Sequence, residues 1–109
     1  MPRIAVIDFE TTGMSPDEGS RATEVGIVLI EGGQVVDRFQ SLMNAGAYVS
    51  PFITQLTGIT NEMVEAAPPA DRVMREAARF VDGAPMVAHN ASFVRKFWAP
   101  YSSPMTMTI

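Results

Sequence analysis

The chain has 109 residues, of which 47% are apolar, and it contains no cysteine. This length suits one domain with a modest core, and the lack of cysteine excludes disulfides and thiolate metal sites. The formal net charge of −4 argues against a broad basic face that coats nucleic acid. This charge is still compatible with an enzyme that binds only the end of a nucleic acid strand, because bound metal ions offset a local cluster of acids.

No apolar run is long enough to span a membrane. The N-terminus also lacks the charged, apolar and small-residue pattern of a signal peptide. We therefore expect a cytoplasmic protein without a membrane partner.

The first predicted element carries the strongest chemical signal. The apolar run of residues 4–7 predicts a strand buried on both faces. Asp8 and Glu10 follow at i and i+2, so their side chains should point to the same face. Unpaired acids are costly at a buried strand end, and Mg²⁺ or Mn²⁺ prefers such oxygen ligands. On spacing alone, the alternative is a strand that runs into a polar loop with two solvated acids.

The next elements predict an antiparallel hairpin. Residues 14–23 contain proline, glycine and polar side chains and are expected to form a loop. Residues 24–31 alternate as a strand, and Gly32-Gly33 is a strong two-residue turn. Residues 34–42 return as a third strand, whose mixed polar and apolar composition suggests a sheet edge.

Three helical segments are predicted in the middle of the chain. Ser50 caps a short helix that Gly58 ends, and residues 61–66 form a further helical turn. Pro68-Pro69 breaks the chain. Asp71 is expected to cap a longer helix over residues 72–82. The buried stripe of this helix is predicted to contain Val73, Ala77, Phe80 and Val81.

The last elements predict a crossover back to the first strand. Residues 86–89 read as a fourth strand, and Asn90 caps a helix over residues 91–98. The alternation of helix and strand favours a fourth strand parallel to the first. The two carboxyl ends, with Asp8 at one and His89 at the other, would then meet at a switch point of the sheet. Residues 105–109 either add an edge strand or fray.

Four short motifs in order resemble the DEDD-type (DnaQ-like) 3′–5′ exonucleases, a family that includes the proofreading subunit of bacterial DNA polymerase III. They are Asp8-Phe9-Glu10-Thr11-Thr12-Gly13, Glu24-Val25-Gly26, Leu56-Thr57-Gly58-Ile59-Thr60 and Ala88-His89-Asn90-Ala91-Ser92-Phe93. The resemblance covers residues 3–98. It implies an α/β, ribonuclease H-like mixed sheet with three antiparallel strands, a parallel fourth and flanking helices, without the C-terminal part of the fold. Residues 1–98 are thus expected to be a partial exonuclease domain, and residues 99–109 a tail that does not match.

The resemblance also implies a reaction, the metal-dependent hydrolysis of phosphodiester bonds at a 3′ end. It gives Asp8 and Glu10 as catalytic, metal-binding residues, with two Mg²⁺ or Mn²⁺ ions in the family's site. The substrate is the 3′ end of a single-stranded nucleic acid, and a DNA polymerase subunit is the suggested partner. The residues implied to receive the terminal nucleotide are Thr11, Thr12, His89, Asn90 and Phe93. Thr12 has an alternative role as a turn residue alone.

The chain departs from the family pattern in two places. Val94 stands where the second motif has an acid, and the third motif, a histidine followed by an aspartate, has no counterpart. His89 is the single histidine and belongs to the second motif. We therefore expect weak or no activity; the alternative is a non-catalytic binding or subunit-interaction module. Glu24 is a lesser candidate near the metal site. Self-association is expected through exposed apolar residues, namely Phe93, Phe97 and Trp98.

Overall fold

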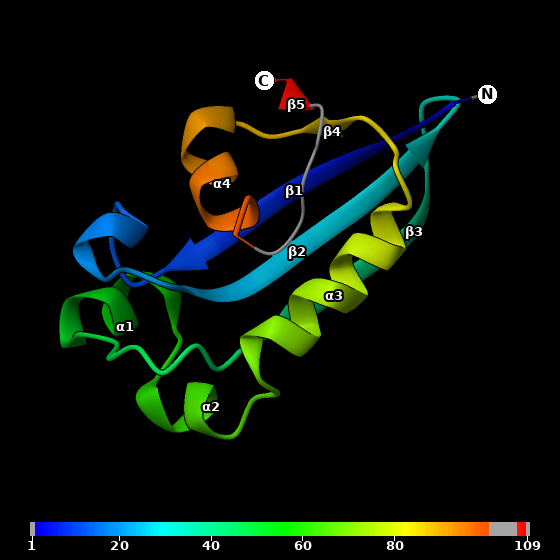
Figure 1. Ribbon diagram of the computed structural model, residues 1–109. Helices are drawn as coiled ribbons and strands as arrows, with labels where there is room; N and C mark the ends of the chain where they lie inside the picture. Colours follow the sequence, from blue (N-terminus) through cyan, green and yellow to red (C-terminus); the bar gives the residue numbers. More distant parts are fainter. Residues whose placement is uncertain (1, 101–106, 109) are drawn as a thin grey trace.

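The computed structural model describes residues 2–100, and residues 107–108 as backbone only. Its centre is a mixed sheet of order β3-β2-β1-β4-β5 (Figure 1). The strands are β1 (Arg3–Thr11), β2 (Ala22–Glu31), β3 (Gln34–Leu42), β4 (Met86–Val87) and β5 (Met107–Thr108). The first three are antiparallel, and β4 runs parallel to β1. This confirms the predicted ribonuclease H-like sheet. The tail was expected either to add an edge strand or to fray. Residues 107–108 form the edge strand β5, which is parallel to β4.

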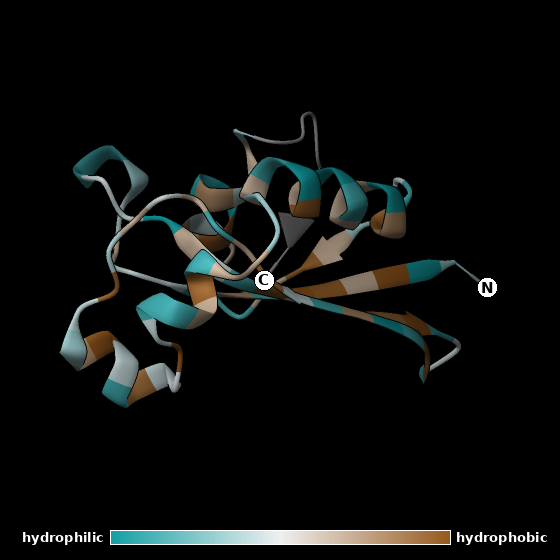
Figure 2. Cartoon of the chain, turned by 90° about the horizontal axis from the view of Figure 1, so that it is seen from below, coloured by the Kyte–Doolittle hydropathy of each residue, from teal (hydrophilic) through white to brown (hydrophobic). Residues whose placement is uncertain are grey.

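Within the described residues, five helical segments accompany the sheet. They are η1 (Pro16–Glu18), α1 (Pro51–Thr57), α2 (Asn61–Glu65), α3 (Ala70–Val81) and α4 (Ala91–Trp98). Helices α3 and α4 lie against one face of the sheet, while α1 lies on the other side, beyond the carboxyl end of β1 (Figure 2). We call the face away from α3 and α4 the open face. No helix in the described part of the chain is long and apolar enough to cross a membrane.

Strand β1 alternates strictly between the core and the open face. Ile7 and Phe9 are buried beneath the helices, whereas Ile4 and Val6 are 39% and 37% exposed. The prediction that residues 4–7 are buried on both faces is therefore wrong. An apolar run shows that a strand has a buried side, but it does not show whether a second layer covers the other side.

Local turn and cap chemistry follows the sequence closely. Gly32 and Gly33 adopt positive φ values of 59° and 78° in the β2–β3 turn, where a residue with a Cβ would be strained. The Ser50 hydroxyl accepts a hydrogen bond from the Ile53 amide at 3.2 Å, as predicted for the cap of α1. Helix α1 ends before Gly58 as expected.

The start of α3 differs from the prediction. The helix begins at Ala70, and Pro69 occupies the N-cap position, so Asp71 lies inside the first turn and is not the cap. The Ala70 amide donates to the carbonyl of Asn44 at 2.9 Å. A backbone carbonyl far away in the sequence thus accepts a hydrogen bond from the start of α3, where the Asp71 side chain was expected to act as the acceptor. The predicted buried stripe holds at its other positions, but Phe80 is only partly buried and packs on Phe39 with ring centroids 5.5 Å apart.

Helix α4 packs its aromatic side chains inward. Phe97 is 3% exposed and Trp98 is 1% exposed, and the Phe97 ring lies 6.3 Å from Phe9 and 5.1 Å from Phe93. The expectation that Phe97 and Trp98 are exposed is wrong, since both are buried and Phe97 packs on Phe9 of β1. Phe93 is partly exposed. The exposed large apolar residues lie elsewhere: on β1, on β3, on the short helices α1 and α2, and in two loops. They are Ile4, Val6, Met14, Val35, Val36, Tyr48, Phe52, Leu56 and Met63.

Candidate active site

Two carboxylates lie side by side on the open face near the carboxyl end of β1. Asp8 and Glu10 alternate with the core residues Ile7 and Phe9, so the predicted shared face is observed. Glu24 of β2 is the direct cross-strand partner of Glu10, and it accepts a hydrogen bond from the Gln40 amide group at 3.1 Å. The sheet therefore gathers three acids, including the lesser candidate Glu24, on one face.

The crowding of these acids has an electrostatic consequence for Glu10. Burial, above all, raises the pKa of the Glu10 carboxyl above its ordinary value, and the negative charges of Asp8 and Glu24 raise it further. The ionised form of Glu10 is thus disfavoured here. A cation placed beside Glu10 would offset this penalty, because it supplies the opposite charge at close range.

A β-bulge fixes the backbone next to Glu10. The register between β1 and β2 shifts between Glu10 and Thr11, which leaves Thr23 as the extra residue. Thr23 is only 2% exposed, and its hydroxyl donates a hydrogen bond to the Glu10 carbonyl at 3.0 Å. Bulges next to sites commonly re-aim a side chain. The sequence analysis placed Thr23 in a loop and missed this hydrogen bond. The one sequence feature that could have indicated it is the position of Thr23 directly before an alternating strand.

The loop after the acids is held by its own threonines. The Thr11 hydroxyl donates to the Gly13 carbonyl at 2.7 Å. The Thr12 hydroxyl accepts from the Arg21 amide at 3.0 Å, and the Thr12 amide donates to the Arg21 carbonyl at 2.9 Å. A Cβ at Gly13 would collide with the Ser20 hydroxyl. These bonds match the turn role of Thr12; contact of Thr11 and Thr12 with a nucleotide stays a prediction.

His89 follows the carboxyl end of β4, in the turn that leads to α4. Strand β4 pairs in parallel with β1 through Met86 with Ala5 and Val87 with Val6. Asp8 and His89 therefore each follow the last paired residue of their strand by two positions. Ala88 is 1% exposed and His89 is exposed. The carboxyl ends of the two strands lie at the same edge of the sheet, as predicted, while a contact between His89 and the acids stays a prediction.

Two other residues of the second motif, Asn90 and Phe93, make contacts within helix α4. The Asn90 side chain accepts a hydrogen bond from the Phe93 amide at 3.2 Å, which makes it the predicted helix cap. Phe93 packs on Phe97, and α4 lies on the side of the sheet away from the acids (Figure 2). The structure thus places Asp8 and Glu10 side by side on β1 and places Phe93 in the packing of α4, while contact of His89, Asn90 and Phe93 with a nucleotide stays a prediction.

Val94 limits what the site can bind. It is 3% exposed and belongs to the main hydrophobic core, so α4 contributes no ligand. Among the residues that the structure describes, no group of three or more His, Cys, Asp or Glu side chains is arranged to hold a metal ion. The carboxylate oxygens of Asp8 and Glu10 are the type of ligand that a hard divalent cation prefers. Two carboxylates are too few, however, for a site of high affinity.

Comparison with known proteins agrees with this architecture. The RNase_T exonuclease family model matches residues 5–103. The 3′–5′ exonuclease DinG of Bacillus subtilis is 45% identical over 91 residues, which are 84% of this chain and 10% of the relative. The PolC-type DNA polymerase III of Thermotoga maritima is 39% identical over 94 residues, 86% of this chain and 7% of the relative. The chain thus spans a tenth or less of these relatives.

Solved structures show the same fold. Exonuclease X in complex with 5′ overhanging duplex DNA has a TM-score of 0.70 at 26% identity, with 94% of this chain and 55% of that chain covered. The nuclease domain of 3′hExo, a DEDDh family member bound to rAMP, has a TM-score of 0.75 at 24% identity, with 91% and 57% covered. The exonuclease family model over residues 5–103 and the 45% identical relative DinG, together with the ordered motifs, show that the chain belongs to the DEDD-type (DnaQ-like) exonuclease family.

Proposed function

We propose that Asp8 and Glu10 are the metal-binding half of a 3′–5′ exonuclease site. The observation that carries this proposal is their position side by side on the open face, with the pKa of Glu10 raised by burial and by the neighbouring acids. Such a cluster is unfavourable by itself and favourable around a divalent cation. The family membership supplies the reaction class, hydrolysis of phosphodiester bonds at 3′ ends.

Each residue near the site has a proposed part in this reaction. Bound Mg²⁺ or Mn²⁺ ions supply an activated water and stabilise the leaving oxygen. Asp8 and Glu10 offer carboxylate oxygens to these ions, and Thr23 holds the Glu10 backbone in place. Exposed His89, which follows the carboxyl end of β4 next to β1, is proposed to contact the strand end. The loop from Thr11 to Gly13 borders the space for the terminal nucleotide.

We propose that the activity of these 109 residues by themselves is weak or nil. Val94 replaces the acid of the second motif with a buried apolar side chain. His89 is the single histidine and lies in the second motif, so no separate general base is available. Loss of a general base alone typically costs about 10²–10⁴-fold in rate.

A non-catalytic role is the second candidate, and the burial of Val94 specifically favours it. An apolar residue in the core supports folding where the family pattern has a metal ligand. On this reading the domain keeps an affinity for the 3′ end of a single strand without cutting it. Relatives named as PolC-type DNA polymerase III make a polymerase subunit the proposed protein partner.

A paired assay separates the two candidates. The chain and its Asp8→Asn variant are incubated with a 3′-ended single strand in Mn²⁺, and released mononucleotides and retained strand are both measured. Hydrolysis by the chain that is absent from Asp8→Asn supports the nuclease. Strand binding by both proteins without hydrolysis supports the binding module. If neither protein binds or cuts the strand in Mn²⁺, both candidates are wrong.

A further inference from the structure

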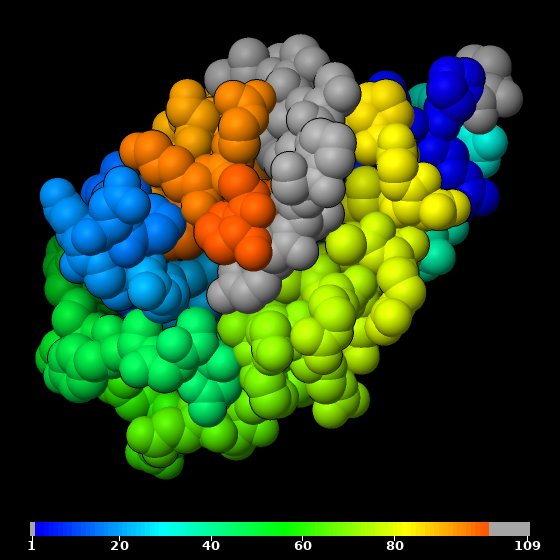
Figure 3. All heavy atoms as spheres, in the orientation of Figure 1, coloured from blue at the N-terminus to red at the C-terminus, as the bar shows by residue number. Residues whose placement is uncertain are grey.

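The turn between α3 and β4 carries the single Asp-Gly step of the chain, Asp82-Gly83. This segment, drawn in yellow, lies at the surface beside the blue start of β1 (Figure 3). The Ala5 amide donates to the Pro85 carbonyl at 2.9 Å, which ties the end of the turn to the amino-terminal half of β1. The turn is therefore at the end of the sheet away from the paired carboxylates.

Asp82 ends α3 in an unfavourable backbone conformation. Among the described residues it is the one residue other than glycine with a positive φ, and its φ and ψ are 50° and 48°. Aspartate adopts this left-handed conformation more readily than most residues, but it is still strained for a residue with a Cβ. Leaving this conformation therefore costs less energy than leaving a relaxed one.

The two groups that could react at this step are unpaired. The Asp82 side chain is exposed and makes no hydrogen bond or ion pair within the described residues. Gly83 is also exposed, and its amide donates no hydrogen bond in the same part of the chain. A backbone hydrogen bond from the Ala84 amide to the Val81 carbonyl, at 3.1 Å, spans the step.

Open space surrounds the peptide unit that joins the two residues. A Cβ placed on Gly83 would meet no atom within 4 Å. The turn also borders a hollow of about 240 Å³, whose other walls include Arg3, Leu29 and Phe80. The carboxyl group of Asp82 and the nitrogen of Gly83 can therefore approach each other without displacing packed side chains.

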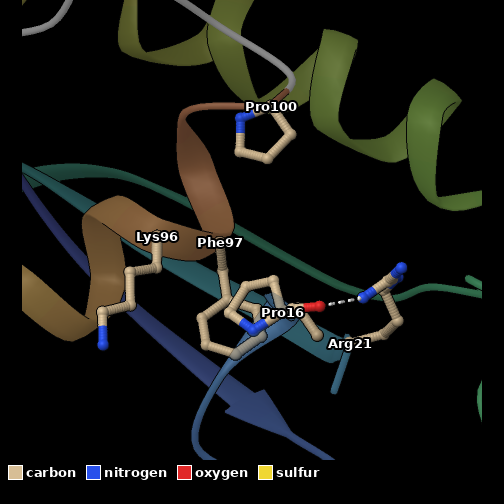
Figure 4. Close-up of a pocket in the computed structure, with 6 residues that line it drawn as sticks. Pro16, Arg21, Lys96, Phe97 and Pro100 are labelled. Carbon is tan, nitrogen blue, oxygen red and sulfur yellow. Dashed lines mark hydrogen bonds between the residues drawn. The ribbon is translucent and has the colours of Figure 1, made fainter. Parts of the chain in front are cut away.

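Asp17 in η1 is exposed as well, but its surroundings differ. The next amide, that of Glu18, donates to the Ser15 carbonyl at 3.1 Å, and the Glu18 side chain hinders access to the nitrogen. The Arg21 side chain also holds this turn, because its Nη1 donates to the Pro16 carbonyl at 3.0 Å (Figure 4). Asp17 therefore serves as an internal control for Asp82.

The remaining aspartates and the asparagines lack this combination of features. Asp8, Asp37 and Asp71 lie within β1, β3 and α3, and each is followed by phenylalanine or arginine. Each asparagine side chain accepts a hydrogen bond from a backbone amide of another residue; these asparagines are Asn44, Asn61 and Asn90.

We propose that Asp82 is a modification site, at which the folded protein converts aspartate to isoaspartate without an enzyme. The Gly83 nitrogen attacks Cγ of Asp82 and forms an N–Cγ bond, while the carboxyl hydroxyl leaves as water with the proton of the amide. A five-membered succinimide ring results. The attack is intramolecular, which gives the nitrogen a high effective concentration, and glycine has no side chain to block it.

Water then opens the ring at either carbonyl. Breaking the N–Cγ bond restores aspartate, whereas breaking the bond from nitrogen to the main-chain carbonyl carbon leaves the chain joined through Cγ. The isoaspartate product has one additional main-chain atom and a free α-carboxylate. The reaction consumes and returns one water, and it needs no oxidant, metal or nucleic acid. It therefore goes beyond the proposed nuclease function.

Peptide mapping tests the proposal. The full-length chain is incubated at neutral pH, once folded and once in guanidinium chloride, and is then digested with a protease that cleaves before aspartate but not before isoaspartate. We expect the peptide with residues 82–83 to gain a resistant form of equal mass, and a transient form lighter by one water. The rate in the folded chain should be comparable to that in denaturant, and Asp17 should stay unchanged.

Three variants locate the reaction. In Asp82→Asn the same ring closure releases ammonia, so the residue becomes aspartate or isoaspartate, and mass spectrometry detects the change directly. Asp82→Gly keeps a left-handed turn without the carboxyl group and should give no resistant form. Glu18→Gly gives Asp17 the same following residue as Asp82 but retains the amide bond to Ser15, so Asp17 should isomerise more slowly than Asp82.

Three results would overturn the proposal. The first is isoaspartate at residue 82 in denaturant alone, because the fold would then protect the step. The second is a folded Asp82→Asn variant that keeps its side-chain nitrogen. The third is equal isomerisation of Asp17 and Asp82 in folded Glu18→Gly, because the unpaired amide of the α3–β4 turn would then play no part.

Discussion

Glu10 and Glu24 are directly opposite one another across the antiparallel pair of β1 and β2. Like charges in this relationship destabilise a sheet. Both residues are only partly exposed, so water screens them incompletely. The domain therefore contains an electrostatic repulsion between Glu10 and Glu24 at the position proposed for a cation, and this repulsion can be measured without any nuclease assay.

Neutralising Glu10 should stabilise the domain at neutral pH. Because the folded state raises the pKa of Glu10, ionisation of this carboxyl opposes folding, and stability falls as the pH rises from the ordinary carboxyl pKa through the folded one. Glu10→Gln should therefore be more stable than the parent at pH 7 and equal to it below the ordinary pKa. Urea unfolding followed by Trp98 fluorescence at a series of pH values measures this. Glu62→Gln, which removes an exposed acid of α2, should show no such pH-dependent gain.

Metal binding by the free chain should be weak. Asp8 and Glu10 are two ligands, whereas Mg²⁺ and Mn²⁺ sites usually draw on further carboxylates, waters or substrate phosphates. Titration calorimetry with Mn²⁺ should detect no tight site. Submicromolar binding that Asp8→Ala abolishes would contradict this expectation. If Glu24→Gln abolished it as well, the cross-strand acid would be shown to complete the site.

The Thr23 hydroxyl should stabilise the bulge beside Glu10. Thr23→Val keeps the shape of the side chain but leaves the Glu10 carbonyl without this donor, which costs about 1–3 kcal/mol for a buried acceptor. Thr23→Ser keeps the hydroxyl and should be the more stable of the two variants in urea unfolding. A valine variant as stable as the serine variant would show that the hydrogen bond contributes nothing.

The sequence was most informative where the physics is local. The Gly32-Gly33 turn, the Ser50 and Asn90 caps and the shared face of Asp8 and Glu10 each depend on a few neighbouring residues. The motif order then supplied the family, and the structure agrees with the mixed sheet that the family implies.

The sequence was least informative about contacts between distant segments. It could not show that the Asn44 carbonyl would accept the hydrogen bond from the first amide of α3, or that Phe97 would be buried against Phe9 of β1. It also could not show that the register shift would make Thr23 a bulge residue. These features depend on which elements meet, and spacing along one chain does not contain that information.

Self-association should proceed through the edge strand β3. Val35 and Val36 are 48% and 46% exposed on a nine-residue edge, and such edges pair with other chains unless charges block them. Light scattering should show growth in mass with protein concentration, and Val36→Lys should reduce it. Gln34→Lys adds the same charge without removing apolar surface and should reduce it less. A monodisperse parent at all concentrations would contradict the prediction.

The last prediction concerns catalysis. The chain should release no more mononucleotides from a 3′-ended single strand in Mn²⁺ than its Asp8→Asn variant does. Loss of a general base and loss of metal ligands each reduce the rate, although the two losses need not multiply, because residues that act as a unit are not additive.

Val94→Asp should not restore activity, since the acid and histidine of the third motif would still be lacking. It should also destabilise the domain, because Val94 is 3% exposed and an ionised carboxylate buried there lacks a partner. Val94→Ala serves as the control for lost volume, and only the aspartate variant should regain stability as the pH falls and the carboxyl is protonated. Mononucleotide release by the unmodified chain, absent from Asp8→Asn, would show that hydrolysis does not need the acid at position 94 or the third motif.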